Sequence, residues 1–382
     1  MQISYTEEEL MIQETAQQFA QAELAPVRKT VESEDQRTLF LSNIAKLGEL
    51  GFMGINIDEQ YGGIGAGSTA FSLAITELAR GCASTAVTTS VTNMVAEVIQ
   101  AVGNEGQKQS YLPKICSGEF TAAGFCLTES IAGSDPSAMK TSAVKDGDEY
   151  VISGSKLYIT SAEYADLFVV WAVTDPTAKK GKGISCFLVD AKIAGISVSK
   201  AEEKMGQKAS STNEVLFDQC RVPASALLGE ENKGFKIAVT ELAGGRIGIA
   251  SLALGLGLEA LDYAKEYIKE RKQFGQALSN FQGLQWMLAD RYTELEAARL
   301  LIMQASALKD QNQPFATAAS MAKVFASEKA NDACYSALQL LGGAGYTQEY
   351  PIEQLARDVR ITTIYEGTSE IQRVIIARDI LS

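Results

Sequence analysis

The spacing of apolar residues changes twice along the chain and so divides it into three parts. In residues 6–118 apolar side chains recur every three or four positions, as at Leu10, Phe19 and Leu24. This spacing is typical of helices with one buried face. The first third of the chain is therefore predicted to be helical.

Residues 120–228 show a different pattern, in which short runs of β-branched and aromatic residues are separated by polar turns. One such turn is 145–148 (KDGD). The runs lie at 150–153, 167–173, 184–189, 196–198 and 214–217. Strands of this length between tight turns predict an antiparallel β-barrel or β-sandwich.

Long helical patterns return in the last third, at 246–267, 280–308 and 316–341. The predicted fold class is α+β with three units. These are an N-terminal helical domain at 1–119, a middle antiparallel β domain at 120–230 and a C-terminal domain at 231–382 that resembles a four-helix bundle.

A dinucleotide-binding fold is excluded by the same order, because no strands and helices alternate and no strand leads into a GxGxxG motif. The glycine-rich segment 62–67 (GGIGAG) follows a helix-like stretch and lacks that spacing. We interpret it as a connecting turn.

The charge and composition of the chain exclude some classes of binding partner. The net charge of −13 and the sequence pI near 4.8 argue against nucleic acid, which needs clustered lysine and arginine. No run of eighteen apolar residues occurs, so no membrane span is predicted. The N-terminal segment MQISYTEEEL is acidic and lacks an export signal pattern, which predicts a cytoplasmic protein.

The chain contains no histidine, which removes several kinds of site. A Ser-His-Asp triad, a Cys-His pair and a histidine-ligated metal are all impossible. The six cysteines are too far apart for a CxxC motif and are interpreted as buried thiols of a reducing compartment. No metal site is predicted.

One carboxylate near the C-terminus stands out as a candidate general base. Glu366 lies in the segment 364–373 (IYEGTSEIQR), next to Gly367 and among the apolar side chains of Ile361 and Ile371. A substrate that displaces water from such a carboxylate raises its pKa toward neutrality. The alternative is an ordinary helix-entry carboxylate beside a capping threonine.

Five short motifs in order together resemble those of the flavin-dependent acyl-CoA dehydrogenase family, over essentially the whole chain. They are 125–135 (FCLTESIAGSD), 154–160 (GSKLYIT), 271–275 (RKQFG), 339–346 (QLLGGAGY) and 365–368 (YEGT). The resemblance implies FAD as cofactor, an acyl-CoA substrate, a homotetramer built as a dimer of dimers, and an electron-transfer flavoprotein as partner.

The resemblance also implies roles for individual residues. The predicted FAD-binding residues are Phe125, Leu127, Thr128, Gly133, Ser134, Tyr158, Ile159, Thr160, Arg271, Gln273, Phe274, Gln282, Gln339, Gly342, Gly343, Thr368 and Glu370. The predicted substrate-binding residues are Ser134, Arg246, Tyr365 and Gly367, with Glu366 as the catalytic base. The segment around Gln339 is expected to reach the nucleotide from a neighbouring subunit.

Plainer interpretations stay open for several of these residues. Leu127, Thr128 and Tyr158 are common strand residues. Gly342 with Gly343 could be a helix C-cap, and Arg246 could form a structural salt bridge.

The chain also departs from the family pattern at four positions. Ser130 replaces a usual proline, Ala243 a frequent acidic residue that contacts CoA, and Glu370 a frequent glutamine. Gly245 occupies the position from which some members supply their base, which leaves Glu366 as the better candidate.

The activity that follows is α,β-dehydrogenation of an acyl-CoA to the trans-2-enoyl-CoA. The segment 246–251 (RIGIAS) most resembles members that act on short-chain or short branched acyl groups. Three alternatives stay open: an acyl-CoA oxidase, an enoyl-CoA reductase, and a catalytically silent CoA-binding homologue.

Overall fold

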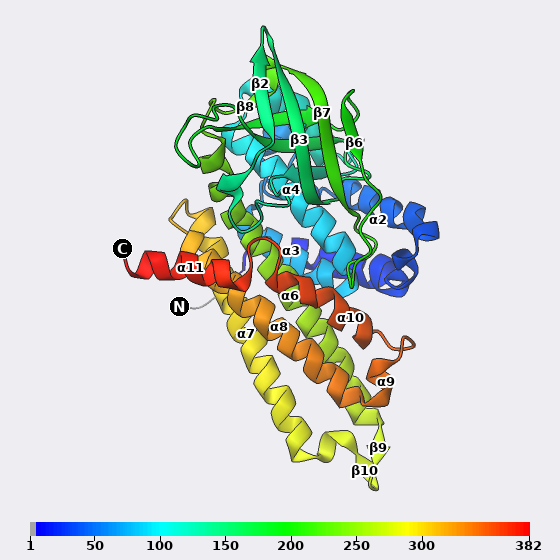
Figure 1. Cartoon of the computed structure of the whole chain (residues 1–382). Helices are drawn as coiled ribbons and strands as arrows, with labels where there is room; N and C mark the ends of the chain where they lie inside the picture. The colour runs from blue at the N-terminus through cyan, green and yellow to red at the C-terminus, as the bar shows by residue number, and fades with distance from the viewer. Residues whose placement is uncertain (1–4) are drawn as a thin grey trace.

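A computed structural model describes residues 5–382 (Figure 1). The first four residues, which belong to the predicted N-terminal domain and to the acidic N-terminal segment, lie outside it. The chain runs from helices through a sheet to helices, in the predicted order. The sheet forms one end of the molecule and the long C-terminal helices form the other (Figure 1).

The N-terminal part contains five α-helices joined by short 3-10 and π turns. They are α1 (Glu7–Phe19), α2 (Arg37–Glu49), α3 (Gly67–Gly81), α4 (Ala83–Val102) and α5 (Glu105–Cys116). Helices α3 and α4 are buried almost all round, because each is apolar or small on most faces. They therefore form the centre of the molecule.

The middle part is an eight-stranded sheet in the order β6-β7-β3-β2-β4-β5-β8, with β1 paired to β4. The strands are β1 (Ala123–Cys126), β2 (Ser142–Asp146), β3 (Glu149–Thr160), β4 (Leu167–Val173), β5 (Ile184–Asp190), β6 (Ile196–Val198), β7 (Thr212–Pro223) and β8 (Leu227–Leu228). Most pairs are antiparallel, as predicted.

Strand β1 differs from the antiparallel pattern, since it pairs with β4 in parallel from Ala123–Leu167 to Cys126–Val170. Strand β2 also meets β4 in parallel, at Ser142–Val173. Strand β4 is buried from Leu167 to Ala172, as expected of a strand covered on both faces. A continuous apolar run predicts such burial but carries no information about the direction of the neighbouring strand.

The C-terminal part contains three long helices, α6 (Gly234–Glu270), α7 (Gln282–Asp310) and α8 (Ala316–Leu341). It ends in α9 (Gly343–Tyr346), α10 (Ile352–Val359), a 3-10 turn η9 (Arg360–Thr363) and α11 (Ser369–Ile380). A small hairpin, β9 (Lys272–Gln273) with β10 (Gln276–Ala277), forms the end farthest from the sheet (Figure 1).

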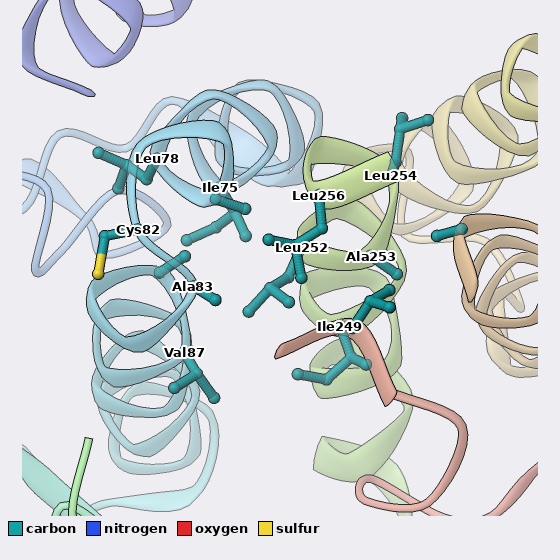
Figure 2. Packing of buried hydrophobic residues seen from close by; sticks show 14 of the residues in the cluster. Ile75, Leu78, Cys82, Ala83, Val87, Ile249, Leu252, Ala253, Leu254 and Leu256 are labelled. Atoms are coloured by element: carbon teal, nitrogen blue, oxygen red, sulfur yellow. The ribbon is translucent and has the colours of Figure 1, made fainter. Parts of the chain in front are cut away.

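Helix α6 packs against helices of both the N-terminal part and the C-terminal part. Figure 2 shows its Ile249, Leu252 and Leu256 facing Ile75 of α3 and Ala83 of α4. Small residues allow this close packing.

At Gly255, for example, an added Cβ would lie 2.9 Å from the Cβ of Ala79. Within residues 5–382, α6 is the helix long and apolar enough to cross a membrane, but its most apolar window is 72% buried in the protein. It is a core helix.

Candidate active site

A cavity of about 1440 Å³ lies where the three parts of the chain meet. Its walls come from α4, from the segment after β1, from the end of β3, from α6 and from the η9–α11 turn. Apolar side chains such as Val91, Met94 and Ile249 cover one part, and Thr128 and Thr160 supply hydroxyl groups in another. The cavity is large enough for a small molecule together with a cofactor ring.

Glu366 lies on the wall formed by the turn before α11. It has a φ of +57°, and Gly367 follows at +91°. Few residues other than glycine adopt this left-handed conformation, which marks a special position. The N-cap of α11 is Thr368, whose hydroxyl accepts from the N–H of Ile371 at 3.4 Å. Glu366 is therefore not the helix-capping carboxylate of the alternative interpretation.

The carboxylate of Glu366 has room because Gly245 of α6 has no side chain. A Cβ at Gly245 would overlap this carboxylate and would lie 2.7 Å from the Sδ of Met94. Within residues 5–382, Oε1 of Glu366 is buried and receives no hydrogen bond. An unpaired buried carboxylate oxygen beside a cavity indicates a functional group.

Burial and two neighbouring cations shift the pKa of Glu366 in opposite directions. Loss of water raises its pKa to about 7, and the positive charges of Arg246 and Lys323 act against this rise. At neutral pH Glu366 is therefore available as a proton acceptor, and its conjugate acid is not strongly disfavoured.

Arg246 lies in the cavity wall four positions after Leu242 on α6. It is buried, its Nη1 lies 3.4 Å from the hydroxyl of Ser320, and its Nε has no partner among the described residues. Burial lowers its pKa, and the charge of Glu366 opposes this shift. No carboxylate of residues 5–382 lies within 4.0 Å of its guanidinium, which argues against the salt-bridge interpretation.

The segment after β1 is fixed by a buried ion pair. Nζ of Lys156 lies 2.8 Å from Oε1 of Glu129 and 3.1 Å from the carbonyl of Leu127. Glu129 also accepts from the N–H groups of Lys140 and Thr141. These contacts hold the turn containing Ser130, where the family motif has a proline.

Tyr158 reaches the cavity because β3 changes register there. The pairing of β3 with β7 shifts between Lys156 and Ile159, and Tyr158 adopts a φ of +59°. Its side chain is 62% exposed, and the N–H of the preceding residue, Leu157, donates to the carbonyl of Thr128 at 2.8 Å. Such irregularities in strands commonly direct side chains toward a ligand.

The lining of this wall fits a flavin ring. Leu127 and Tyr158 supply apolar and aromatic surface, and Thr128 and Thr160 supply hydroxyl groups for the polar edge of the ring. The polar groups lie at the β-domain wall, and Glu366 lies on a different wall of the same cavity. A substrate between the two walls would be enclosed by both.

Most of the predicted site residues line this cavity. They are Phe125, Leu127, Thr128, Gly133, Ser134, Tyr158, Thr160, Arg246, Tyr365, Glu366, Gly367 and Thr368. Ile159 is instead buried in the core of the β domain. Glu370 lines a neighbouring open cavity of about 530 Å³ on α8 and α11, which Thr368 also borders.

The remaining predicted FAD residues lie at the other end of the C-terminal helices. They are Arg271, Gln273, Phe274, Gln282, Gln339, Gly342 and Gly343, and all are exposed. Gln339 is 16 positions after Lys323 on α8, which corresponds to about 24 Å along the helix. Within one chain, these residues therefore do not lie at the cavity.

Three residues near Glu366 were not predicted. Met94 of α4 packs beside the carboxylate of Glu366, and Lys323 of α8 and Gln372 of α11 donate hydrogen bonds to carbonyl groups of the turn that contains Glu366. A lysine within the helical pattern 319–326 (ASMAKVFA) could have been noticed, because its neighbours on both sides are apolar. The pattern alone does not show what it contacts.

Comparison with known families identifies all three parts of the chain. Residues 6–119 match the N-terminal domain of acyl-CoA dehydrogenase, residues 124–220 its middle domain and residues 232–381 its C-terminal domain. The chain is 43% identical to a short-chain specific acyl-CoA dehydrogenase of Clostridium acetobutylicum, with 99% of each chain covered. It is 42% identical to an acryloyl-CoA reductase (NADH) of Anaerotignum propionicum, over 100% of this chain and 96% of the relative.

Solved structures show the same similarity. The butyryl-CoA dehydrogenase of Megasphaera elsdenii superposes with a TM-score of 0.95 at 38% identity, over 100% of both chains. A chain in a structure described as the electron transferring flavoprotein of Acidaminococcus fermentans gives a TM-score of 0.96 at 43% identity, again over 100% of both chains. On the evidence of these matches and of its cavity, the chain belongs to the acyl-CoA dehydrogenase family of FAD-dependent oxidoreductases.

Proposed function

We propose that this enzyme converts a short-chain or short branched acyl-CoA to its trans-2-enoyl-CoA, with Glu366 as the base. The carboxylate of Glu366 takes the proton from the α-carbon, the bond between the α- and β-carbons becomes double, and the β-hydrogen leaves with two electrons. Bound FAD supplies the acceptor for that hydride. A second flavoprotein would then take up the two electrons.

The observation that carries this proposal is the shared cavity. Oε1 of Glu366, which has no hydrogen-bond partner within residues 5–382, borders the same space as the predicted flavin-binding hydroxyls of Thr128 and Thr160. A base on one side of a substrate and a hydride acceptor on the other is the arrangement that α,β-dehydrogenation requires.

The turn of Glu366 also supports polarisation of the thioester. Within residues 5–382, the N–H of Glu366 donates to no backbone carbonyl, so it is available for the thioester oxygen. A hydrogen bond to that oxygen stabilises the negative charge that develops when the α-proton leaves. Arg246 contributes a positive charge to the same wall.

The proposed substrate size rests on the cavity wall and on the relatives. Val87, Val91 and Met94 of α4 border the cavity together with Ile249 of α6. These apolar side chains are suited to a short hydrocarbon group. The relative from Clostridium acetobutylicum carries the description short-chain specific, and butyryl-CoA dehydrogenase is a structural neighbour.

An electron-transfer flavoprotein is the proposed electron acceptor. The support is that a structurally similar chain comes from a structure described as the electron transferring flavoprotein of Acidaminococcus fermentans. The second candidate is reduction of an enoyl-CoA, which uses the same groups in reverse. It is favoured by the similarity to an acryloyl-CoA reductase.

The test is anaerobic mixing of the purified enzyme with acyl-CoAs of increasing chain length, followed at the flavin absorption band. We expect about one FAD per chain and the fastest bleaching with short acyl groups. Subsequent mixing with air tests the oxidase alternative, because an oxidase is reoxidised rapidly. Bleaching by NADH rather than by acyl-CoA would favour the reductase, and a colourless protein would favour the silent homologue.

A Glu366→Gln variant tests the base. It should still bind FAD and acyl-CoA while flavin reduction falls about 100-fold or more, because the amide cannot accept a proton. Glu241→Gln is the matched control, since burial also raises the pKa of Glu241 to about 7 but its side chain does not line the cavity. Unchanged reduction in Glu366→Gln would remove Glu366 from the mechanism.

A further inference from the structure

We propose that buried Lys323 is a positioning residue for the base, and that it acts with Gln372 by fixing the turn that carries Glu366. This inference rests on the proposed function, because it takes Glu366 to be the proton acceptor. Neither side chain lines the cavity. Both act through the backbone of residues 366 and 367.

The contacts of the two side chains converge on adjacent carbonyl groups. Nζ of Lys323 donates to the carbonyl of Gly367 at 2.7 Å. Nε2 of Gln372 donates to the same carbonyl at 2.9 Å and to the carbonyl of Glu366 at 3.1 Å. Lys323 comes from α8 and Gln372 from α11, so the turn is held from two helices.

The turn needs this support for two reasons. Glu366 has a positive φ, a conformation that persists only where the surroundings impose it. In addition, Oε1 of its carboxylate has no hydrogen-bond partner among residues 5–382. The direction of the carboxylate is therefore set by the backbone, and the backbone is set by Lys323 and Gln372.

The environment of Lys323 is unusual for a lysine. Its side chain is fully buried, with 0% exposure, and no carboxylate of the described residues lies within the 4.0 Å of an ion pair. A buried ammonium is costly unless a specific interaction compensates for the loss of water. Within residues 5–382 it donates its hydrogen bond to the turn that carries Glu366.

The charged groups around Lys323 come from three helices and the turn. Glu366 faces it from the turn, Arg246 from α6, Glu328 from α8 and Glu370 from α11. Burial lowers the pKa of Lys323 to about 8, so the side chain is largely cationic at neutral pH. Glu328 is already paired with Arg373 at 2.8 Å, and Glu370 is exposed.

The positive charge of Lys323 also favours the ionised form of Glu366. Lys323 therefore has two separable effects, one on the geometry of the turn and one on the protonation of the base. Gln372 shares the first effect but carries no charge. The two residues should consequently give different pH profiles when they are replaced.

The experiment compares Lys323→Met and Gln372→Met as holoenzymes. For Lys323→Met we expect flavin reduction to fall about tenfold or more, with its pH midpoint moved upward by about half a unit or more. For Gln372→Met we expect a similar loss of rate with the midpoint unchanged. FAD content and the affinity for a non-reducible acyl-CoA thioether should stay within about threefold of the parent.

Lys204→Met is the matched control. Lys204 is a partly buried lysine whose pKa is likewise lowered to about 8, and it donates to the carbonyl of Ser210 at 2.7 Å, away from the cavity. The Lys204→Met variant should leave both the rate of flavin reduction and its pH midpoint unchanged. If Lys323→Met does not fold, Lys323→Arg keeps the charge and should keep the parental midpoint while the rate falls.

A parental rate and midpoint in Lys323→Met would overturn the proposal. Infrared difference spectroscopy of the carboxyl band lost in Glu366→Gln gives the pKa of Glu366 without any turnover. An enzyme that no acyl-CoA bleaches would contradict the proposed function alone, whereas an unshifted infrared pKa in Lys323→Met would contradict the assignment of Lys323.

Discussion

The carboxylate of Glu366, the proposed base, has its place only because Gly245 has no side chain. The carboxylate of Glu366 fills the space where a Cβ would stand, and Met94 closes the other side at 2.7 Å from that point. We expect Gly245→Ala to displace the carboxylate and to slow flavin reduction about tenfold or more. FAD content should not change, because the flavin wall lies elsewhere in the cavity.

Gly283→Ala is a suitable control for Gly245→Ala. Gly283 is also a helical glycine, and a Cβ there would meet no atom of residues 5–382 within 4 Å. Stopped-flow reduction rates of the two variants should therefore differ. Equal rates would show that the carboxylate moves aside without loss of function.

The pH dependence of flavin reduction follows from the pKa of Glu366, which burial raises to about 7. The base acts in its ionised form, so the rate should be low below this pH, rise through about 7 and level off above it. A bound acyl group excludes water and should move the midpoint further upward. Single-turnover reduction at fixed substrate saturation across pH 5.5–9 checks this, and a rate that is constant with pH would contradict it.

At the level of single residues, sequence motifs predicted the groups that line the cavity better than the groups that support them. Glu366, Thr128 and Arg246 lie in motifs with recognisable chemistry. Lys323 was missed because a lysine within a helix usually has its charge in water, and only the fold shows that Lys323 is buried and contacts the turn before α11. Supporting contacts depend on helices far apart in the sequence.

Among the helices, α3 begins without a capping side chain of its own. Its N-terminal N–H groups are instead satisfied by Asp310 at the end of α7, which accepts from Ser68 at 2.5 Å and from Thr69 at 3.0 Å. This contact joins two helices 242 residues apart in sequence. A carboxylate at a helix N-terminus also interacts favourably with the helix dipole.

We expect Asp310→Ala to destabilise the protein by about 1–2 kcal/mol, because it leaves buried or half-buried N–H groups without an acceptor. The melting temperature should fall while the rate of flavin reduction per bound FAD stays near the parental value. Asp290→Ala is the control, since Asp290 lies on the exposed face of the same helix. An unchanged melting temperature in Asp310→Ala would contradict the capping role.

The secondary-structure elements themselves could largely be predicted, because apolar spacing differs clearly between the helical and β parts. The parallel pairing of β1 could not, since alternation along one strand does not specify its neighbour. The register shift beside Tyr158 could not be predicted from the sequence either. Nothing in GSKLYIT shows that its pairing with β7 changes register there and resumes at Ile159.

At the scale of the whole molecule, most of the predicted FAD-binding residues fall into two groups. One group lines the cavity, and the other lies at the exposed end of the bundle, where Gln339 is about 24 Å from Lys323 along α8. Phe274 in the second group is 93% exposed, which is unusual for a large apolar side chain outside an interface. The separation supports the proposal that a neighbouring subunit completes each FAD site.

We therefore expect Arg271→Ala to weaken FAD binding about tenfold or more, by removing a charge-assisted contact to the cofactor diphosphate. Lys145→Ala is the control, since Lys145 is an exposed cation of strand β2, and Figure 1 shows β2 at the opposite end of the molecule from the β9–β10 hairpin. Release of FAD is followed by fluorescence, and the oligomeric state by light scattering. A monomer that retains FAD tightly would contradict the shared site.

The position of Glu366 in the chain has a consequence for the order in which the protein is made. The walls contributed by α4, β3 and α6 are all synthesised before the base, which leaves the ribosome only after α7 and α8. A growing chain, or one cleaved between α8 and the turn, would present most of the flavin wall and Arg246 but no proton acceptor. The chain would thus gain its proposed proton acceptor only after the walls from α4, β3 and α6 have been made.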